Sequence, residues 1–575
     1  MTISRTGLAV GLLYLFTVVC FISHYNWPSE IFLWIGVIAS TLAVWASIRA
    51  TVGKGYKLVS VILFLICIRI LPMLRLLLSG LTFRADAADA LQLAQQIDER
   101  GSFDFGIGTG RAPAFSYFPA MYILTVVLAN ISGSAIETIA YLLPLLTGIV
   151  TMIVFYVMVR GLSDEVAALA IVVYSMGRTF LFFDDKYVPE AFGLTFYAIS
   201  LMMFFYIYVY KKTSPKLAAI GTMAYIMVAL SHHWSSFNLI FILTFFFCFV
   251  LLHNRLLGRL QRYNLKLRFS AISLLLSVCV LSTWLFFVAN NVAQRDLKVF
   301  ARFLSLSVGT IQHTHPIMPV NTPLERALIV AGYSVLAIVG VLKFSSSVLE
   351  RDKASNEVFF RSWFIFGAVF ILLPYTLASA TFYYIDVHRT WSFAFFGLSP
   401  VIAWGLVNIP FLKPARRKKL ATFTPLLLIF PLISTVLAGP VYVRNPFYYP
   451  EVESYRNTGF WIRYHLNVDT VVIDTYSREI VATYGRVPKA IPPVITDTAT
   501  DQQIIVYESA DLSFVAPAGS TIVLNNELNR LGLWFLEGGR PLKMANATVC
   551  LKDTGLRCQR IYDCSSLTVL KGYSG

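Results

Sequence analysis

Charged residues are scarce in this chain. Asp, Glu, Lys and Arg together make up 14% of its 575 residues, while 57% of the residues are hydrophobic. Soluble domains carry roughly a quarter charged residues. Apolar runs of about 20 residues, the length that crosses a bilayer, recur from the start of the chain to about residue 440. This composition excludes an ordinary soluble protein and predicts an α-helical polytopic membrane protein.

Acidic residues are in particularly short supply. The chain has 31 Asp and Glu against 47 Lys and Arg, a net charge of +16. An excess of this size can indicate nucleic-acid binding, but here the clustered basic residues lie between apolar runs. In that position they act as topology signals and as contacts to anionic lipid headgroups. We therefore expect membrane lipids as partners and no nucleic acid.

Cysteines are also few. Cys20, Cys67, Cys248 and Cys279 lie inside apolar runs, where packing explains them. Three more lie in the polar tail: Cys550, Cys558 and Cys564. An odd number allows at most one disulfide among them, and the sequence does not choose the pair.

The sequence shows no internal repeat, no low-complexity tract and no convincing small-residue cleavage site after its first apolar run. That run, residues 7–25, is therefore interpreted as a retained helix. About 13 transmembrane helices are expected, near residues 7–25, 29–48, 57–79, 137–160, 163–181, 189–210, 214–231, 235–253, 268–290, 324–343, 361–380, 391–410 and 419–440. With these spans every basic loop falls on the cytoplasmic side.

One apolar segment must not be counted as a span if all the basic loops are to lie on the cytoplasmic side. Phe115–Gly133 has the composition of a span, but counting it would move "KKTSPK" and "RLLGRLQRYNLKLR" to the outer side. We interpret it as a helix at the membrane surface, within one outer loop of residues 82–136. An ordinary additional span is the alternative.

This topology brings most of the acidic and histidine side chains to the outer face. They come from loops that are far apart in the sequence, mostly at expected helix ends, and ionisable groups near a bilayer are costly unless they are paired, hydrated or functional. The sequence therefore predicts that they meet in one extracytoplasmic cavity. The residues are Asp86, Asp89, Asp98, Glu99, Asp104, Asp184, Asp185, Glu190, His232, His233, His313, His315, Asp386, His388 and Arg389.

The tail forms the second expected domain. Residues 1–440 are assigned to the transmembrane domain, which includes the 82–136 loop, and residues 441–575 to a small C-terminal extracytoplasmic mixed α/β domain. Short β-type runs such as "DTVVIDT" and "STIVLNN" alternate in the tail with polar, Gly and Pro stretches. Asn546-Ala-Thr548 is a glycosylation sequon on the side where such modification occurs.

The layout resembles that of the GT-C glycosyltransferases, integral membrane enzymes that use polyprenyl-phosphate-linked sugars. The resemblance is carried by an apolar span, Leu58–Leu78, followed by the acidic loop "RADAADALQLAQQIDERG" and then "RAPAFSYFPAMYIL". A second acidic loop before a span, "FFDDKYVPEAFGLTFYAISL", adds to it. The chain differs in having two additional spans before the first acidic loop. It also lacks the "WWDYG" motif of oligosaccharyltransferases, which argues against that subfamily.

The resemblance implies a glycosyltransferase that moves a hexosyl or pentosyl group to a glycan, lipid or protein acceptor. The catalytic carboxylate of such enzymes opens the first outer loop, and the matching residue is Asp86, with Asp89 as the second candidate. Capping or solvation of a surface helix is the ordinary structural explanation of both residues.

The second acidic loop gives candidates for metal and phosphate binding. Asp184, Asp185 and Glu190 are potential oxygen ligands for a divalent cation, Mg²⁺ or Mn²⁺, which only some branches of the family use. A solvated turn explains them equally well. Lys186 beside them is a candidate partner for the donor phosphate.

Histidine and arginine candidates lie near three other helix ends. His232 and His233 are candidate hydrogen-bond donors to a phosphate or sugar; on one continuous helix neighbouring residues point apart, so both are not expected to bind one ion. Arg389, with His388 beside it, is the strongest phosphate-binding candidate because a guanidinium makes two parallel hydrogen bonds to a phosphate. An ion pair with Asp386 is the alternative for Arg389.

A second class of function fits the composition as well. A lipid-linked sugar transporter or flippase would need ionisable residues along several spans, broken helices and repeated halves. Arg69 and Arg75 inside the third expected span favour it. The absence of a repeat, and the gathering of acidic residues at one face, favour the transferase.

Overall fold

The protein is described from a computed structural model. The described residues form two compact units, one of residues 1–75, 141–308 and 321–441, the other of residues 76–140, 309–320 and 442–575. The described ranges are 5–26, 86–106, 112–175, 186–210, 215–256, 260–294, 359–368, 384–407, 452–466, 478–487 and the ten strands given below, with single positions between 32 and 83, between 338 and 342, and at 468.

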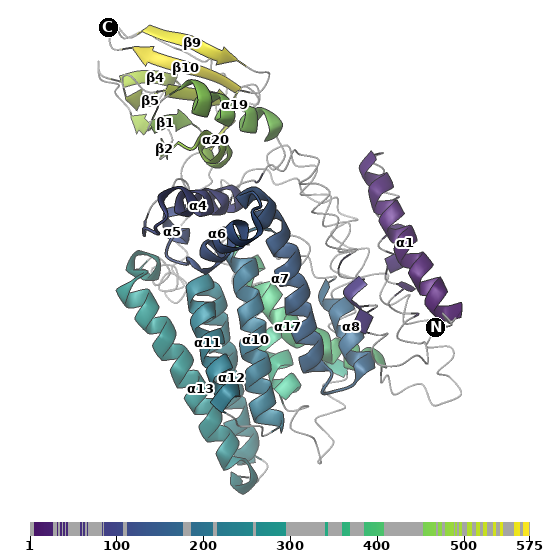
Figure 1. The fold of residues 1–575 in the computed structure, drawn as a ribbon. Coiled ribbons are helices and arrows are strands. Elements are labelled where there is room, and N and C mark those ends of the chain that lie inside the picture. The colour runs from purple at the N-terminus through teal and green to yellow at the C-terminus, as the bar shows by residue number, and fades with distance from the viewer. Residues whose placement is uncertain are drawn as a thin grey trace. The chain divides into compact units, whose positions relative to one another are not determined.

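The first unit is built from long apolar helices (Figure 1). Neighbours along the chain pack against each other in the series α10, α11, α12 and α13, and α8 packs against α17. The helices are α1 (Arg5–Asn26), most of α7 (Ile136–Val159), α8 (Asp164–Ser175), α10 (Pro189–Tyr210), α11 (Pro215–Ser231), α12 (His233–Leu256), α13 (Leu260–Phe287) and α17 (Tyr384–Val407).

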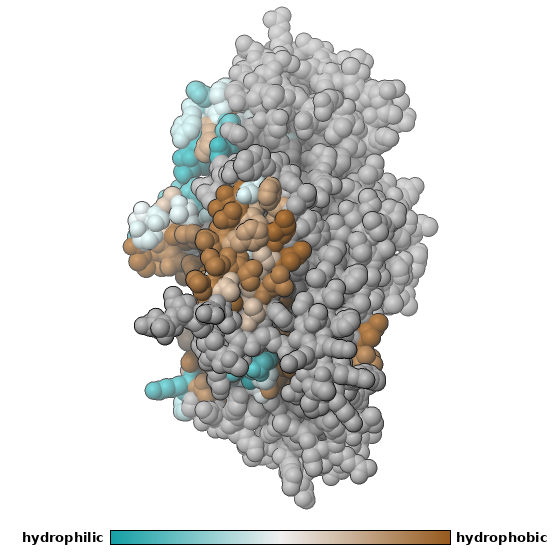
Figure 2. Space-filling model, turned by 90° about the vertical axis from the view of Figure 1, so that its right-hand side faces the viewer, coloured by the Kyte–Doolittle hydropathy of each residue, from teal (hydrophilic) through white to brown (hydrophobic). Residues whose placement is uncertain are grey.

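Most of these helices are apolar on all sides, as expected for helices that meet either protein or lipid all round. Two described helices are long and apolar enough to cross a membrane, Ile136–Val159 and Pro189–Ile207. Large apolar side chains remain exposed on α7, on α11 and on α13, for example Leu146 at 53%, Met223 at 68% and Phe287 at 85%. Figure 2 shows a continuous hydrophobic area on the described surface that it presents.

An aromatic core fills the first unit. The rings of Tyr197 and Phe393 lie 4.9 Å apart edge to face, and that of Trp363 is stacked 6.0 Å from Phe396. Glycine permits the close approach of these segments, since a Cβ at Gly397 would clash with the carbonyl oxygen of Trp363. The helical segment 359–368 and α17 therefore touch backbone to backbone.

The second unit contains the helices of the first outer loop. They are α4 (Asp86–Arg100), α5 (Ala112–Phe115) and α6 (Ala120–Ser132), and α6 packs on α4. Gly133 follows the last residue of α6 and caps it, and its φ of 64° is the left-handed conformation that glycine adopts without strain. Its 13 residues span only about 20 Å at 1.5 Å per residue, which is too short to cross a bilayer of about 30 Å.

The tail adds α19 (Val452–His465), α20 (Arg478–Gly485) and strands to the second unit. Strand β1 (Thr470–Ile473), α20 and β2 (Lys489–Ile491) form a parallel β-α-β unit in a five-stranded sheet of order β2-β1-β6-β10-β9. The other strands of this sheet are β6 (Thr521–Asn525), β9 (Arg557–Asp563) and β10 (Leu567–Tyr573), where β6 is parallel to β1 and β10 is antiparallel to β6 and β9. The unit has a second, antiparallel sheet of order β3-β5-β4 (Val494–Thr496, Ser513–Pro517, Gln503–Glu508). It also has a hairpin of β7 (Leu533–Phe535) and β8 (Pro541–Lys543).

Glycine also brings α19 and α20 together in this unit. A Cβ at Gly459 would lie 2.9 Å from the Tyr484 Cβ and from the Gly485 nitrogen. Tyr455, which is fully buried, and Val481 belong to the apolar cluster between the two helices and β1. This packing fixes α20 on the side that faces α19.

Several sequence expectations can now be compared with this fold. Described helices lie over eight of the expected spans: 7–25, 137–160, 163–181, 189–210, 214–231, 235–253, 268–290 and 391–410. The other five fall wholly or partly outside the described residues, so the count of 13 stays a prediction. Residues 76–140 and 442–575 belong to one compact unit, and the expected division at residue 440 stays a prediction.

Candidate functional site

The two acidic candidates of the first outer loop lie at the start of α4. Asp86 is the first residue of the helix, and Asp89 is also in its first turn, where negative charge is favourable. Their surroundings differ, because Asp86 is half-buried while Asp89 is 0% exposed. Of the two residues, only Asp86 is therefore partly exposed.

Residues at the end of α20 hold the start of α4 in place. The Phe83 backbone N–H donates to the Tyr484 hydroxyl at 3.0 Å, and the Thr483 hydroxyl donates to the Ala88 carbonyl at 3.0 Å. The Gln92 side-chain amide reaches the Val487 carbonyl at 3.4 Å. These hydrogen bonds lie before, within and after the first turn of α4, so they fix the segment that carries both carboxylates.

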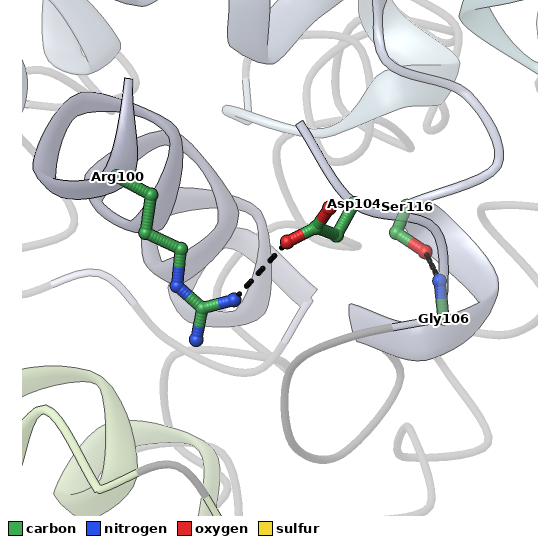
Figure 3. A network of polar contacts seen from close by, with 4 residues as sticks. All are labelled: Arg100, Asp104, Gly106 and Ser116. Carbon is green, nitrogen blue, oxygen red and sulfur yellow. Dashed lines mark hydrogen bonds and ion pairs between the residues drawn. The ribbon is translucent and has the colours of Figure 1, made fainter. Parts of the chain in front are cut away.

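Two polar contacts lie at the other end of α4 and in the turn that follows it (Figure 3). Arg100 pairs with Asp104 at 3.3 Å, and the Gly106 N–H donates to the Ser116 hydroxyl at 2.6 Å. Gly101 and Gly106 have φ values of 63° and 77°, which glycine tolerates without strain. The turn between α4 and α5 is thus determined locally.

In the first unit, the candidates of the second acidic loop separate by exposure. Lys186 is exposed, whereas Glu190 is 7% exposed in the first turn of α10. Gly193 lies one turn further along the same face. A Cβ there would lie 2.6 Å from the Ser235 hydroxyl oxygen and 3.1 Å from the His232 Cβ. This close approach places the start of α10 against the junction between α11 and α12.

That junction buries the two neighbouring histidines. His232 and His233 are 3% and 6% exposed, and their rings lie 4.7 Å apart at 48°. His232 lies between α11 and α12, and its backbone N–H donates to the Val228 carbonyl at 3.1 Å. The two imidazoles are thus buried side by side at this junction.

Buried polar groups continue from this junction along α12. His232 Nδ1 lies 3.4 Å from the Ser235 hydroxyl, and the Ser236 hydroxyl donates to the His232 carbonyl at 3.1 Å. The Asn238 amide donates to the Trp234 carbonyl at 2.8 Å, while its buried Oδ1 accepts no hydrogen bond from the described residues. A row of buried polar groups in an otherwise apolar helix is typical of a functional site.

The structure describes the other predicted site residues only in part. Arg389 and His388 lie within α17, near its beginning, but their side chains are outside the described part of the structure. Asp184 and Asp185 lie outside the described residues altogether. Asp86 and Asp89 belong to one compact unit, while Lys186, Glu190, the His pair and Arg389 belong to the other, so the common cavity stays a prediction.

Some polar residues of both sites were not predicted from the sequence. Thr483, Tyr484 and Gln92 join segments about 400 positions apart, and nothing in a single sequence indicates such pairs. Ser235 and Asn238 are different, because polar residues that follow a His pair within an apolar run are visible in "SHHWSSFN". That run could have extended the prediction along α12.

Comparison with known proteins finds likeness of fold. No protein-family model and no curated protein matches the sequence. The crystal structure of ArnT from Cupriavidus metallidurans, bound to undecaprenyl phosphate, is 11% identical, with 91% of this chain and 98% of ArnT covered at a TM-score of 0.50. The mycobacterial arabinofuranosyltransferase AftD is 14% identical at a TM-score of 0.52, with 92% of this chain but only 40% of AftD covered. The chain has the fold of GT-C glycosyltransferases.

Proposed function

We propose that this protein is a membrane glycosyltransferase that moves a sugar from a polyprenyl-phosphate-linked donor to an acceptor on the extracytoplasmic face. The likeness of fold to ArnT over nearly the whole of both chains carries this proposal. The ArnT structure holds undecaprenyl phosphate, the lipid phosphate that such a transfer releases. In this proposal residues 1–440 form a multi-pass domain of about 13 spans, and residues 441–575 form an extracytoplasmic α/β domain.

The proposed chemistry is inversion with a carboxylate base. The acceptor hydroxyl attacks the anomeric carbon, its oxygen forms the new glycosidic bond, and the bond from that carbon to the phosphate oxygen breaks. Asp86 accepts the hydroxyl proton, and polyprenyl phosphate leaves with the bonding electrons. Asp86 is preferred to Asp89 because the base must touch the acceptor, and Asp89 is fully buried.

Positively charged side chains and neutral hydrogen-bond donors are proposed to bind the leaving phosphate. Arg389 and Lys186 supply positive charge, and His232, His233 and His388 supply hydrogen bonds to the phosphate or the sugar. The burial of the His pair supports this, since hydrogen bonds are stronger where water is excluded.

A divalent cation is proposed only at Asp184, Asp185 and Glu190, whose carboxylate oxygens would be its ligands. Glu190 is a buried carboxylate in the first turn of α10, which suits an oxygen ligand. Within the described part of the chain, no three His, Cys, Asp or Glu side chains lie close enough to hold a metal ion. Treatment with a chelator, followed by Mg²⁺ or Mn²⁺, tests this assignment directly.

The decisive experiment measures transfer from a labelled polyprenyl-phosphate sugar by the purified full-length protein in lipid nanodiscs. We expect Asp86→Asn to reduce the rate by about a hundredfold or more, the usual contribution of a general base. Asp104→Asn is the matched control, because Asp104 is an exposed carboxylate of the same loop that pairs with the exposed Arg100. Unchanged transfer in Asp86→Asn would overturn the mechanism, and movement of the donor across the bilayer without transfer would favour a flippase.

Reporter fusions test the proposed topology independently of activity. A fusion after Gly133 is expected to report the extracytoplasmic side, and one after Lys212 the cytoplasmic side. The opposite result at either position would mean that Phe115–Gly133 crosses the membrane or that a span is miscounted.

A further inference from the structure

A polar pocket lies in the second unit, outside the proposed catalytic residues. Its volume is about 240 Å³, far more than the roughly 10–15 Å³ that one water needs on the same measure. It is lined by the second half of α4, by the turn between α6 and α7, and by Arg486, which follows α20. The pocket is therefore large enough for a small organic molecule.

Hydrogen-bond acceptors dominate the lining. Asp98, Glu99 and Glu137 contribute three carboxylates, and Arg486 contributes one guanidinium, which leaves a net charge of −2. Arg486 pairs with Glu99. Burial lowers the pKa of Arg486, which the nearby Asp98 carboxylate partly opposes, but a guanidinium stays charged in proteins. The positive charge is thus already engaged, and the remaining acidic groups are left for a ligand.

A buried amide provides a second, independent indication of a ligand. Gln95 is 7% exposed, and its Nε2 donates to Glu137 Oε1 at 2.8 Å. This contact fixes the amide orientation, since a flipped amide would place two acceptors against each other. Gln95 lines the pocket, and its buried Oε1 accepts no hydrogen bond from the described residues. A buried carbonyl oxygen of this kind costs free energy unless a ligand or water donates to it.

We propose that this pocket binds a small molecule bearing a primary ammonium group. An ammonium supplies three donors and one positive charge, which matches the Gln95 oxygen, the Glu137 carboxylate and the surplus negative charge. A metal ion fits less well, because the acidic side chains here do not form a metal-binding group within the described residues. A neutral polyol would satisfy the acceptors but leave the charge uncompensated.

The test measures ethanolamine binding to the full-length protein, by titration calorimetry or ligand-observed NMR, with no sugar donor present. We expect saturable binding that weakens about fivefold in Glu137→Gln and in Asp98→Asn, the effect of removing one partly screened charge. Glu137→Gln retains an acceptor for Gln95, so the local fold is preserved. Asp104→Asn, which removes a carboxylate of the same unit outside the pocket, is expected to change nothing.

Further arms of the test separate the possible sources and the competing ligands. Competition by nanodiscs that contain phosphatidylethanolamine, but not by phosphatidylcholine, would identify a lipid headgroup as the source. Binding of free ethanolamine without such competition would identify a soluble amine. Absence of saturable binding, equal binding of glycerol, displacement by Mg²⁺ at similar concentrations, or unchanged affinity in both pocket variants would each overturn the proposal. Since no transfer is measured, failure here leaves the proposed enzyme activity untouched.

Discussion

The contact between Tyr484 and the start of α4 allows a quantitative prediction. Tyr484→Phe removes only the hydroxyl that accepts the Phe83 N–H at 3.0 Å. Phe83 is 1% exposed, so its N–H is left without water as a replacement partner. Burying such a group without a partner costs about 1–3 kcal/mol. Thr483→Val should cost less, about 0.5–1.5 kcal/mol, since Ala88 is a helical residue whose carbonyl also lies within the hydrogen-bonding ladder of α4.

Hydrogen exchange followed by mass spectrometry measures this effect where it should occur. A loss of 1–3 kcal/mol in the free energy that holds α4 closed corresponds to about 5- to 150-fold faster exchange of its amides. The acceleration is expected in peptides that cover residues 83–100 and in α20, and not in α10 to α13. If the catalytic assignment of Asp86 is correct, the rate of sugar transfer falls as well, because the carboxylate loses its fixed position.

The control for this experiment is the same chemical change at an exposed position. Tyr464 lies in α19 of the same unit and is 70% exposed. Tyr464→Phe should leave the exchange of α4 unchanged. Equal exchange of α4 in the wild-type protein and in Tyr484→Phe would show that the hydroxyl does not hold the helix, and the reasoning would fail.

Two glycine substitutions test the helix packing of the first unit. Gly193→Ala is expected to destabilise the protein by about 1–3 kcal/mol, because the added methyl lies 2.6 Å from the Ser235 hydroxyl oxygen; thermal unfolding in detergent measures this, and an unchanged midpoint would contradict the close packing. Gly397→Ala should be at least as harmful, since its clash is with the rigid carbonyl of Trp363. Gly11→Ala, where nothing lies within 4 Å, should be harmless, and equal losses at Gly397 and Gly11 would refute the packing argument.

Sequence patterns predicted the helices well because helix formation here is governed by local composition. An apolar run of about 20 residues between polar or basic stretches has few alternatives to a helix. Some described helices accordingly lie within a residue or two of the expected limits, as for α7 at Ile136–Val159 against the expected 137–160, while α13 and α17 begin eight and seven residues earlier than expected. Composition alone did not distinguish Phe115–Gly133 from the spans; the distribution of basic loops did, and the helix found there, Ala120–Ser132, is too short to cross a bilayer.

Positions of side chains relative to one another could not be predicted in the same way. Asp86 and Asp89 share a helical face at their spacing, yet one is half-buried and the other fully buried. The difference arises from what packs against α4, and those partners are remote in the sequence. The 4.7 Å approach of the His232 and His233 rings is likewise a feature that the apolar pattern of the segment does not reveal.

Helix α4 shows why the tail matters for the proposed site. An isolated helix of 15 residues is marginal in water, and this one has a polar composition that gives little drive to bury it. In the structure every residue from Ala87 to Gln95 is buried, including polar side chains such as Gln92. Partners for that face come from α6 within the loop and from α20 in the tail. The position of the proposed catalytic carboxylate is consequently determined by residues that the chain supplies about 400 positions later, and the tail is a structural part of the site that presents Asp86.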